Sequence, residues 1–117
     1  MLFNLWATWC APCRAEMPAL DALQGELGGD KFEVVLVSVD LGTPAKPRKF
    51  YDDIGMKNAG FYHDGELKTL NVLKKAGLAF GLPATLLIND EGCVLGTLNG
   101  PAEWASDDAI KLVKTAL

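Results

Sequence analysis

The residues from Phe32 to Val39 form a nearly continuous, β-branched apolar run, and this run places the strongest limit on the fold. A strand that is apolar on both sides must be covered on both faces, which is typical of a parallel strand in an α/β sheet. Parallel neighbours need crossover connections, and these are usually helices. The run therefore predicts a sheet with helices on both of its faces.

Shorter patterns on either side of this run predict the other elements. From Ala11 to Leu27, apolar residues recur every three or four positions, and Gly28 follows as a stop signal, so a helix is expected there. Pro18 lies inside this pattern and should kink the helix. Further strands are expected at residues 2–7, 60–63, 84–89 and 93–98, and further helices at 47–54, 67–77 and 106–116. The last helix should bury one face, formed by Ala109, Leu112, Val113 and Ala116.

This order of elements predicts an α/β fold with a central mixed sheet. Parallel pairing comes first, and an antiparallel hairpin joined by residues 89–92 comes last. A chain of 117 residues suits a single domain, residues 1–117. Its 11 basic and 15 acidic residues give a net charge of −4, which argues against nucleic acid or an anionic membrane surface as a partner.

Cys10 and Cys13 form a Cys-x-x-Cys motif between the first expected strand and the first expected helix. The motif places Cys10 at the helix N-terminus, where unpaired N–H groups and the helix dipole stabilise a thiolate. Cys13 follows one turn later, close enough to attack a mixed disulfide. Pro12 fits an early helical position, which needs no N–H donor. The motif therefore predicts thiol–disulfide exchange.

Zinc binding is the alternative use of two cysteines at this spacing. Structural zinc normally takes four Cys or His ligands, and outside the motif the chain has only Cys93 and His63. We therefore favour the redox interpretation. No cofactor is expected, because the dithiol itself carries the two electrons.

The segment from Asn4 to Pro18, Asn-Leu-Trp-Ala-Thr-Trp-Cys-Ala-Pro-Cys-Arg-Ala-Glu-Met-Pro, resembles the active-site segment of thioredoxin-fold proteins of the TlpA/ResA/CcmG type. The resemblance covers essentially the whole chain, including Gly92-Cys93 and residues 100–106, and is closest to TlpA. It implies a thioredoxin-like fold. It also implies a protein-disulfide reductase that acts on assembly partners of cytochrome c or cytochrome oxidase.

The resemblance also implies a periplasmic, membrane-anchored protein. Met1 leads into Leu2–Trp6 without a signal-peptide pattern, and members of the family carry further strands upstream. We therefore expect an N-terminally truncated domain, with the anchor in a preceding segment. The implied partners are a disulfide-containing protein substrate and a membrane dithiol donor that re-reduces a monomeric enzyme.

Residue roles follow from the resemblance by position. Cys10 matches the nucleophile and Cys13 the resolving thiol. Pro83 matches the family's cis-proline, which would leave the Leu82 backbone free to pair with a substrate strand. An ordinary trans proline at the start of a strand is the alternative. The expected substrate contacts are Trp9, Ala11, Pro12 and Leu82.

Glu16 can be placed from its spacing as well as from the resemblance. It shares the inward stripe of the first helix with Cys13, Leu20, Leu23 and Leu27. A carboxyl there is partly desolvated and could exchange a proton with Cys13. Thioredoxin keeps a buried acid where this chain has Asn4, so we hypothesise that Glu16 has taken over its role. The alternative is that Glu16 reaches solvent and only favours the helix dipole.

The remaining unusual residues carry less specific signals. Trp6 is expected in the core and Trp9 over Cys10. His63 is expected to be a surface or turn residue without a site. Cys93 has two interpretations: an inert buried thiol, or the partner of a cysteine in the upstream strands that family members carry.

Other functions fit the motif less well. A copper-binding assembly factor on the same fold is the main alternative, but it usually spaces its cysteines more widely and adds a distal His. A thiol peroxidase needs a proline where this chain has Trp9, and a non-catalytic binding domain needs no complete motif. Strong oxidants place a His between the cysteines. Since Ala11 and Pro12 offer none, we expect a reductase with a potential near ~ −270 mV rather than ~ −120 mV.

Overall fold

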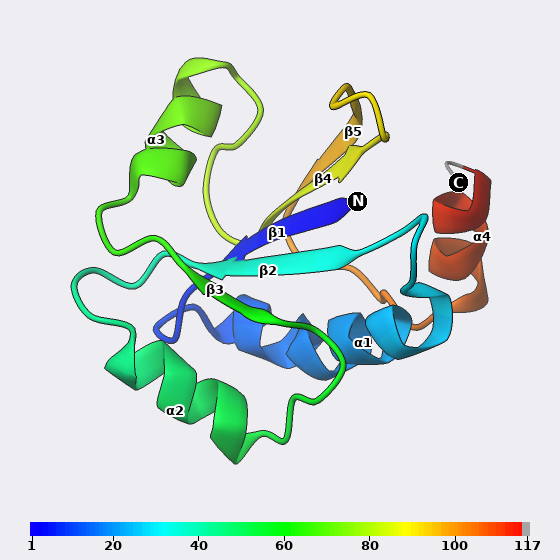
Figure 1. Ribbon diagram of the computed structural model, residues 1–117. Coiled ribbons are helices and arrows are strands. Elements are labelled where there is room, and N and C mark those ends of the chain that lie inside the picture. The colour runs from blue at the N-terminus through cyan, green and yellow to red at the C-terminus, as the bar shows by residue number, and fades with distance from the viewer. Residues whose placement is uncertain (116–117) are drawn as a thin grey trace.

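The computed structural model describes residues 1–115, which form a five-stranded sheet with helices around it (Figure 1). The strands follow the order β3-β2-β1-β4-β5 across the sheet. Parallel pairing joins β1, β2 and β3, while β4 and β5 form an antiparallel hairpin whose first strand pairs with β1. The predicted mixed sheet is therefore confirmed. In chain order the elements are β1 (Leu2–Trp6), α1 (Ala11–Leu27), β2 (Val34–Ser38), α2 (Ala45–Asp53), β3 (Phe61–His63), α3 (Lys68–Lys75), β4 (Ala84–Ile88), β5 (Val94–Asn99) and α4 (Asp107–Thr115).

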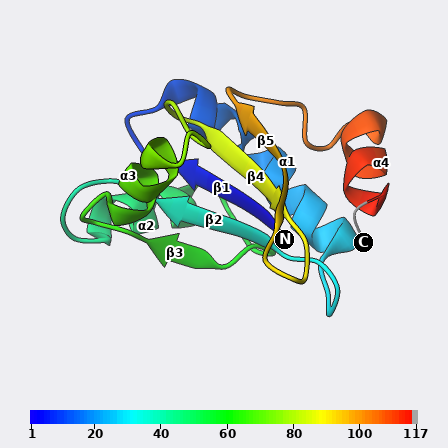
Figure 2. The same cartoon turned by 90° about the horizontal axis from the view of Figure 1, so that it is seen from above.

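Helices cover both faces of the sheet, as the run at residues 32–39 predicted. Helices α1, α2 and α4 lie on one face and α3 lies on the other (Figures 1 and 2). In the central strand β1, the neighbours Leu5 and Trp6 point to opposite faces, and both are fully buried. Trp6 packs on Phe50 and Tyr51 of α2, which confirms its expected place in the core.

Helix α1 has the bounds that the apolar spacing predicted. It begins one residue after Cys10 and ends before Gly28, whose N–H donates to the carbonyl of Gln24 over 2.8 Å. Its inward stripe is buried from Cys13 to Leu23 and half-buried at Leu27, and Pro18 lies within the helix on the exposed side. Because α1 starts directly after the loop that leaves β1, the first turn of the helix lies at the carboxyl end of the central strand.

The elements lie within two residues of their predicted bounds, and two of the differences have a local cause. Strand β2 starts at Val34 because Phe32 instead forms an isolated bridge with Gly29. Helix α2 starts at Ala45, two residues earlier than expected, so that Pro47 lies in its first turn rather than at its start. None of the helices within residues 1–115 is long and apolar enough to cross a bilayer.

His63 ends strand β3, as the strand expected at residues 60–63 implied. Its ring nitrogens lie 3.3 Å from the Ser38 hydroxyl and 2.8 Å from the carbonyl oxygen of Gly42. A carbonyl only accepts, so the nitrogen beside Gly42 carries the proton. His63 therefore fastens the loop after β2 to the sheet.

The face predicted for the last helix is partly wrong. Val113 is buried and Ala109 is half-buried, but Leu112 is 56% exposed. Successive residues of a helix are about 100° apart, so Leu112 turns away from the face centred on Val113. It lies at the rim of a groove between α4 and β5. Ala116, the fourth member of the predicted face, lies outside the described residues.

Cys93 is exposed, so the prediction of a buried thiol is wrong. The residue precedes β5 in the hairpin turn, where the chain leaves the core, and its N–H donates to Asn89 Oδ1 over 2.9 Å. Apolar spacing alone assigned it to the strand. Its pairing with an upstream cysteine stays a prediction.

Candidate active site

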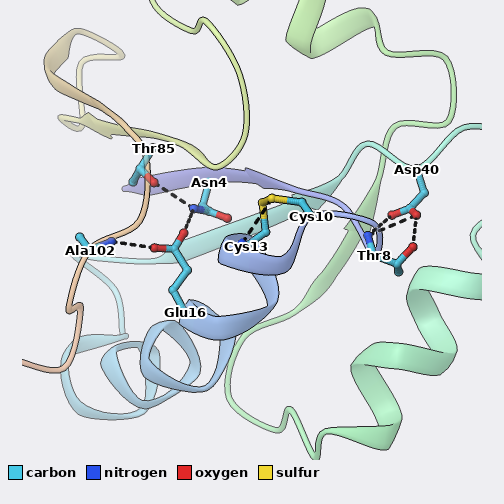
Figure 3. The surroundings of a disulfide bond; sticks show 8 residues. All are labelled: Asn4, Thr8, Cys10, Cys13, Glu16, Asp40, Thr85 and Ala102. Atoms are coloured by element: carbon cyan, nitrogen blue, oxygen red, sulfur yellow. Dashed lines mark hydrogen bonds between the residues drawn. A yellow bond between two sulfur atoms is a disulfide. The ribbon is translucent and has the colours of Figure 1, made fainter.

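Cys10 and Cys13 form a disulfide at the first turn of α1 (Figure 3). Cys10 occupies the N-cap in an extended conformation, and its sulfur accepts the Cys13 N–H over 3.3 Å. The Cα atoms are 5.3 Å apart. Cys10 is 6% exposed and Cys13 is 0% exposed, so the sulfur at the helix N-terminus is the one that a second molecule can approach.

A buried carboxylate fixes the loop that leads into this pair. Asp40 lies two residues after the end of β2 and accepts hydrogen bonds from the Thr8 backbone N–H over 3.0 Å and from the Thr8 hydroxyl (Figure 3). The Ser38 hydroxyl adds a third bond over 2.8 Å. This contact was not among those predicted from the sequence. The signal for it was the parallel pairing of two strands, since their carboxyl ends, with Thr8 and Asp40 just beyond them, meet at one edge of the sheet.

Glu16 is buried beneath the Cys pair, which excludes the alternative of a solvent-facing side chain. One carboxylate oxygen accepts from Asn4 Nδ2 over 3.1 Å (Figure 3). The other accepts from the Ala102 N–H over 3.1 Å and from Trp104 Nε1 over 3.0 Å. The partners from residues 102 and 104 are 86 and 88 positions away in the chain, and sequence spacing gives no signal for them. Glu16 therefore joins α1 to β1 and to the segment before α4.

Burial and hydrogen bonding act in opposite directions on the pKa of Glu16. Burial raises the pKa of its carboxyl above the ordinary value of 4.5, and the three hydrogen bonds oppose this rise only in part. A groove lined by Pro12, Ala15 and Ala102 reaches the Glu16 side chain. Glu16 can therefore bind a proton at a pH above the usual range of a carboxylate.

Asn4 of β1 lies between Glu16 and the Cys pair (Figure 3). It is fully buried, and its amide nitrogen donates to Glu16 and, over 2.9 Å, to the Thr85 hydroxyl. Thr85 is the cross-strand neighbour of Asn4 in β4, so the sheet register itself produces this contact. In the sequence Asn4 stands where thioredoxin has a buried acid, and its local spacing predicts no contact for it.

The bond between Leu82 and Pro83 is cis, as the resemblance implied. Ala84, the next residue, pairs with Leu5 near the end of β1. This antiparallel register places Pro83 next to the carboxyl end of β1, where the chain leaves that strand toward Cys10. Leu82 is half-buried and precedes it at this edge of the sheet.

Trp9 stands out from the surface beside the pair, with 67% of its side chain exposed. It borders a groove that Arg14, Lys46, Lys49 and Phe50 also line. Ala11 and Pro12, between the two cysteines, are exposed as well. The four positions expected to contact substrate are thus Trp9, Ala11 and Pro12 on the surface and Leu82 at the sheet edge.

Cys93 and His63 do not belong to this site. Cys93 lies in the hairpin turn between β4 and β5, and His63 bonds the loop after β2. Over residues 1–115, no three His, Cys, Asp or Glu side chains gather closely enough to hold a metal ion. The chemistry that the arrangement supports is that of the dithiol pair.

Known proteins share this fold and this segment. The thiol-disulfide oxidoreductase ResA of Halalkalibacterium halodurans is 29% identical over 115 residues, covering 97% of this chain and 62% of that protein. A thiol:disulfide interchange protein of the thioredoxin family from Chlorobium tepidum TLS is 26% identical, with a TM-score of 0.77 over 98% of this chain and 77% of that one. The exposed lipoprotein thioredoxin of Streptococcus pneumoniae strain TIGR4 is 25% identical, with a TM-score of 0.75 over 99% of this chain and 83% of that one.

The thioredoxin-like fold is therefore confirmed, and so is the resemblance to the TlpA/ResA/CcmG type; the closeness to TlpA itself stays a prediction. The chain spans less than two thirds of the length of the curated relatives that it matches first. The Redoxin family profile matches residues 1–113, which include the whole site built around Cys10 and Cys13. The chain belongs to the Redoxin family.

Proposed function

We propose that this protein is a thiol–disulfide oxidoreductase that reduces disulfide bonds in other proteins through Cys10 and Cys13. The observation that supports this most directly is the position of the pair. Cys10 caps α1 and is slightly exposed, and Cys13 lies fully buried one turn behind it. The name of the ResA relative, a thiol-disulfide oxidoreductase, points to the same activity.

The reaction needs only these two sulfurs. In the reduced protein the Cys10 thiolate attacks one sulfur of the substrate disulfide, so that a mixed disulfide forms and the other substrate sulfur leaves and takes a proton. The Cys13 thiolate then attacks the Cys10 sulfur and releases the second substrate thiol, which also takes a proton. The substrate gains two electrons and two protons, and the protein ends with the Cys10–Cys13 disulfide seen in the structure.

We further propose that Glu16 takes the proton of Cys13 when Cys13 becomes a thiolate. The two residues lie on the same inward face of α1, and burial raises the pKa of Glu16 above that of an exposed carboxyl, which favours proton uptake. The groove beside Pro12 gives water a path to this carboxyl.

Glu16→Gln tests this role. The substitution keeps the shape of the side chain but removes its proton exchange, so the rate of disulfide reduction should lose one limb of its pH profile and fall about 10-fold or more near neutral pH. The measurement is the single-turnover rate against pH, and Glu26→Gln on the exposed side of α1 is the matched control. An unchanged pH profile in the Glu16 variant would remove the proposal.

A protein substrate would bind at the edge around Cys10. Trp9, Ala11 and Pro12 present exposed surface there, and the backbone of Leu82 could pair with an extended substrate segment. We propose an extracytoplasmic location, supported by the relative described as an exposed lipoprotein. We further propose that the protein is a monomer, that a membrane anchor lies outside this stretch and that a membrane dithiol donor re-reduces the pair. Its proposed substrates are proteins of cytochrome c or cytochrome oxidase assembly.

A redox titration of the Cys10–Cys13 pair tests the function itself. The protein is equilibrated in dithiothreitol or glutathione buffers and followed by Trp fluorescence, with Cys93→Ser present to leave a single pair of thiols. We expect one two-electron transition well below about −200 mV, near ~ −270 mV. A transition well above that range would make the protein an oxidant or isomerase. The absence of a transition would rule out the redox function.

A further inference from the structure

The amide oxygen of Asn4 is a buried acceptor without a donor. Asn4 is fully buried, and within residues 1–115 its Oδ1 is one of only two buried side-chain polar atoms that have no hydrogen-bond partner. The other is the indole nitrogen of Trp6. Buried polar groups are nearly always paired, and an unpaired one costs about 1–3 kcal/mol. An orphaned acceptor next to a redox pair therefore suggests a donor that is present in the other redox state.

The orientation of the Asn4 amide follows from its partners. The amide nitrogen faces Glu16 and donates to its Oε1 over 3.1 Å. The same nitrogen donates to the Thr85 hydroxyl at 2.9 Å. These two bonds hold the amide nitrogen on the side away from the cysteines, and the amide oxygen points toward Cys13 and Cys10 (Figure 3).

Cys13 can supply the missing donor only when it is reduced. Its side chain is fully buried. In the disulfide both sulfurs lack hydrogen and Asn4 Oδ1 stays unpaired. After reduction the Cys13 thiol carries an S–H group, which is a weak donor that fits a carbonyl-type acceptor.

We propose that Asn4 is a positioning residue whose amide oxygen accepts the Cys13 S–H in the reduced protein, so that it stabilises the dithiol and links Cys13 to Glu16 through one amide group. The proposal rests on the proposed dithiol function. With glutathione as reductant, two glutathione thiols give two electrons and two protons, the Cys10–Cys13 bond breaks and glutathione disulfide forms. Cys13 takes one of the protons and holds it against Asn4.

Asn4 should therefore set the redox equilibrium of the pair. The proposed bond exists only in the reduced state, and the unpaired acceptor penalises only the oxidised state. Both effects favour the dithiol. Asn4→Ala should thus shift the equilibrium toward the disulfide by about 10-fold, which corresponds to a potential about 30 mV more negative.

The test is the equilibrium constant with glutathione, measured for Asn4→Ala in the Cys93→Ser protein. Thr85→Val is the matched control, because it removes the other partner of the Asn4 amide nitrogen but leaves the oxygen in place. It should shift the equilibrium by less than about 3-fold. The Asn4→Ala comparison is repeated in a Glu16→Ala background, where the bond from Asn4 to Glu16 is already absent and the shift should persist. An Asn4→Ala variant that titrates like its parent would overturn the inference.

A second measurement needs no change at Asn4. In a Cys10→Ala, Cys93→Ser protein, Cys13 is the sole thiol, and its S–H stretching band in the infrared reports its hydrogen bond directly. We expect a band at the lower frequency of a hydrogen-bonded thiol. A band at the frequency of a free thiol would contradict the role of Asn4 even if the wild-type pair titrates normally. A wild-type pair that does not titrate would instead contradict the proposed function.

Discussion

Replacing Cys10 with serine should reduce disulfide-reductase activity to the uncatalysed background, a loss of about 10³-fold or more. Cys10 holds the sulfur at the N-terminus of α1 that a substrate can approach, whereas Cys13 is fully buried. Cys13→Ser should behave differently. Its Cys10 should still attack the substrate, but no second thiol is left to release it, so a covalent mixed disulfide should accumulate.

The two variants are compared on a peptide disulfide by mass spectrometry without reductant. The Cys13 variant should carry one peptide on Cys10, removable by dithiothreitol, and the Cys10 variant should carry none at residue 13. Because Cys93 is exposed and could form adducts of its own, both variants are made with Cys93→Ser, which alone should leave turnover unchanged. A peptide found on Cys13 of the Cys10 variant would reverse the assigned roles.

Replacing Glu16 with alanine should lower the free energy of unfolding by about 2–5 kcal/mol, although the residue makes no ion pair. Its carboxylate accepts hydrogen bonds from Asn4, Ala102 and Trp104, and the last two lose a buried acceptor. The measurement is urea unfolding of the oxidised protein. Glu26→Ala, an exposed acid on the same helix, is the control and should change stability by less than about 0.5 kcal/mol.

This difference should depend on pH in a defined direction. The pKa of Glu16 is raised in the folded protein above its ordinary value of 4.5. At pH values between these two pKa values, the native state therefore binds more protons than the unfolded state. The contribution of Glu16 to the stability of the wild-type protein is therefore fully present below pH 4.5. It declines as the pH rises and is lost once the pH passes the raised pKa. The alanine variant lacks this decline, so the gap between the two proteins should be widest near about pH 4 and narrower near about pH 8. A gap that widens with pH would mean that the ionised form is the one stabilised.

The local patterns were reliable wherever one helix or one strand decided the outcome. The three- and four-residue spacing predicted both ends of α1, and the motif at its start placed Cys10 at the cap. The same spacing predicted that Glu16 points inward, because a helix fixes the direction of each side chain relative to its neighbours. It failed for Leu112, which lies beside the buried face of α4, and for Cys93, which precedes a strand whose residues are all exposed.

The sequence by itself thus determined the order of strands and helices, the redox pair and the inward direction of Glu16. Only the tertiary structure decided what those side chains meet. Ala102 and Trp104 reach Glu16 from the far end of the chain, and Asp40 holds Thr8 because two parallel strands end side by side. The register of β1 against β4 places Thr85 beside Asn4 and leaves one amide oxygen facing the cysteines. Periodicity reports the face on which a residue lies, but a polar contact depends on a neighbour that sheet pairing brings from a distant segment.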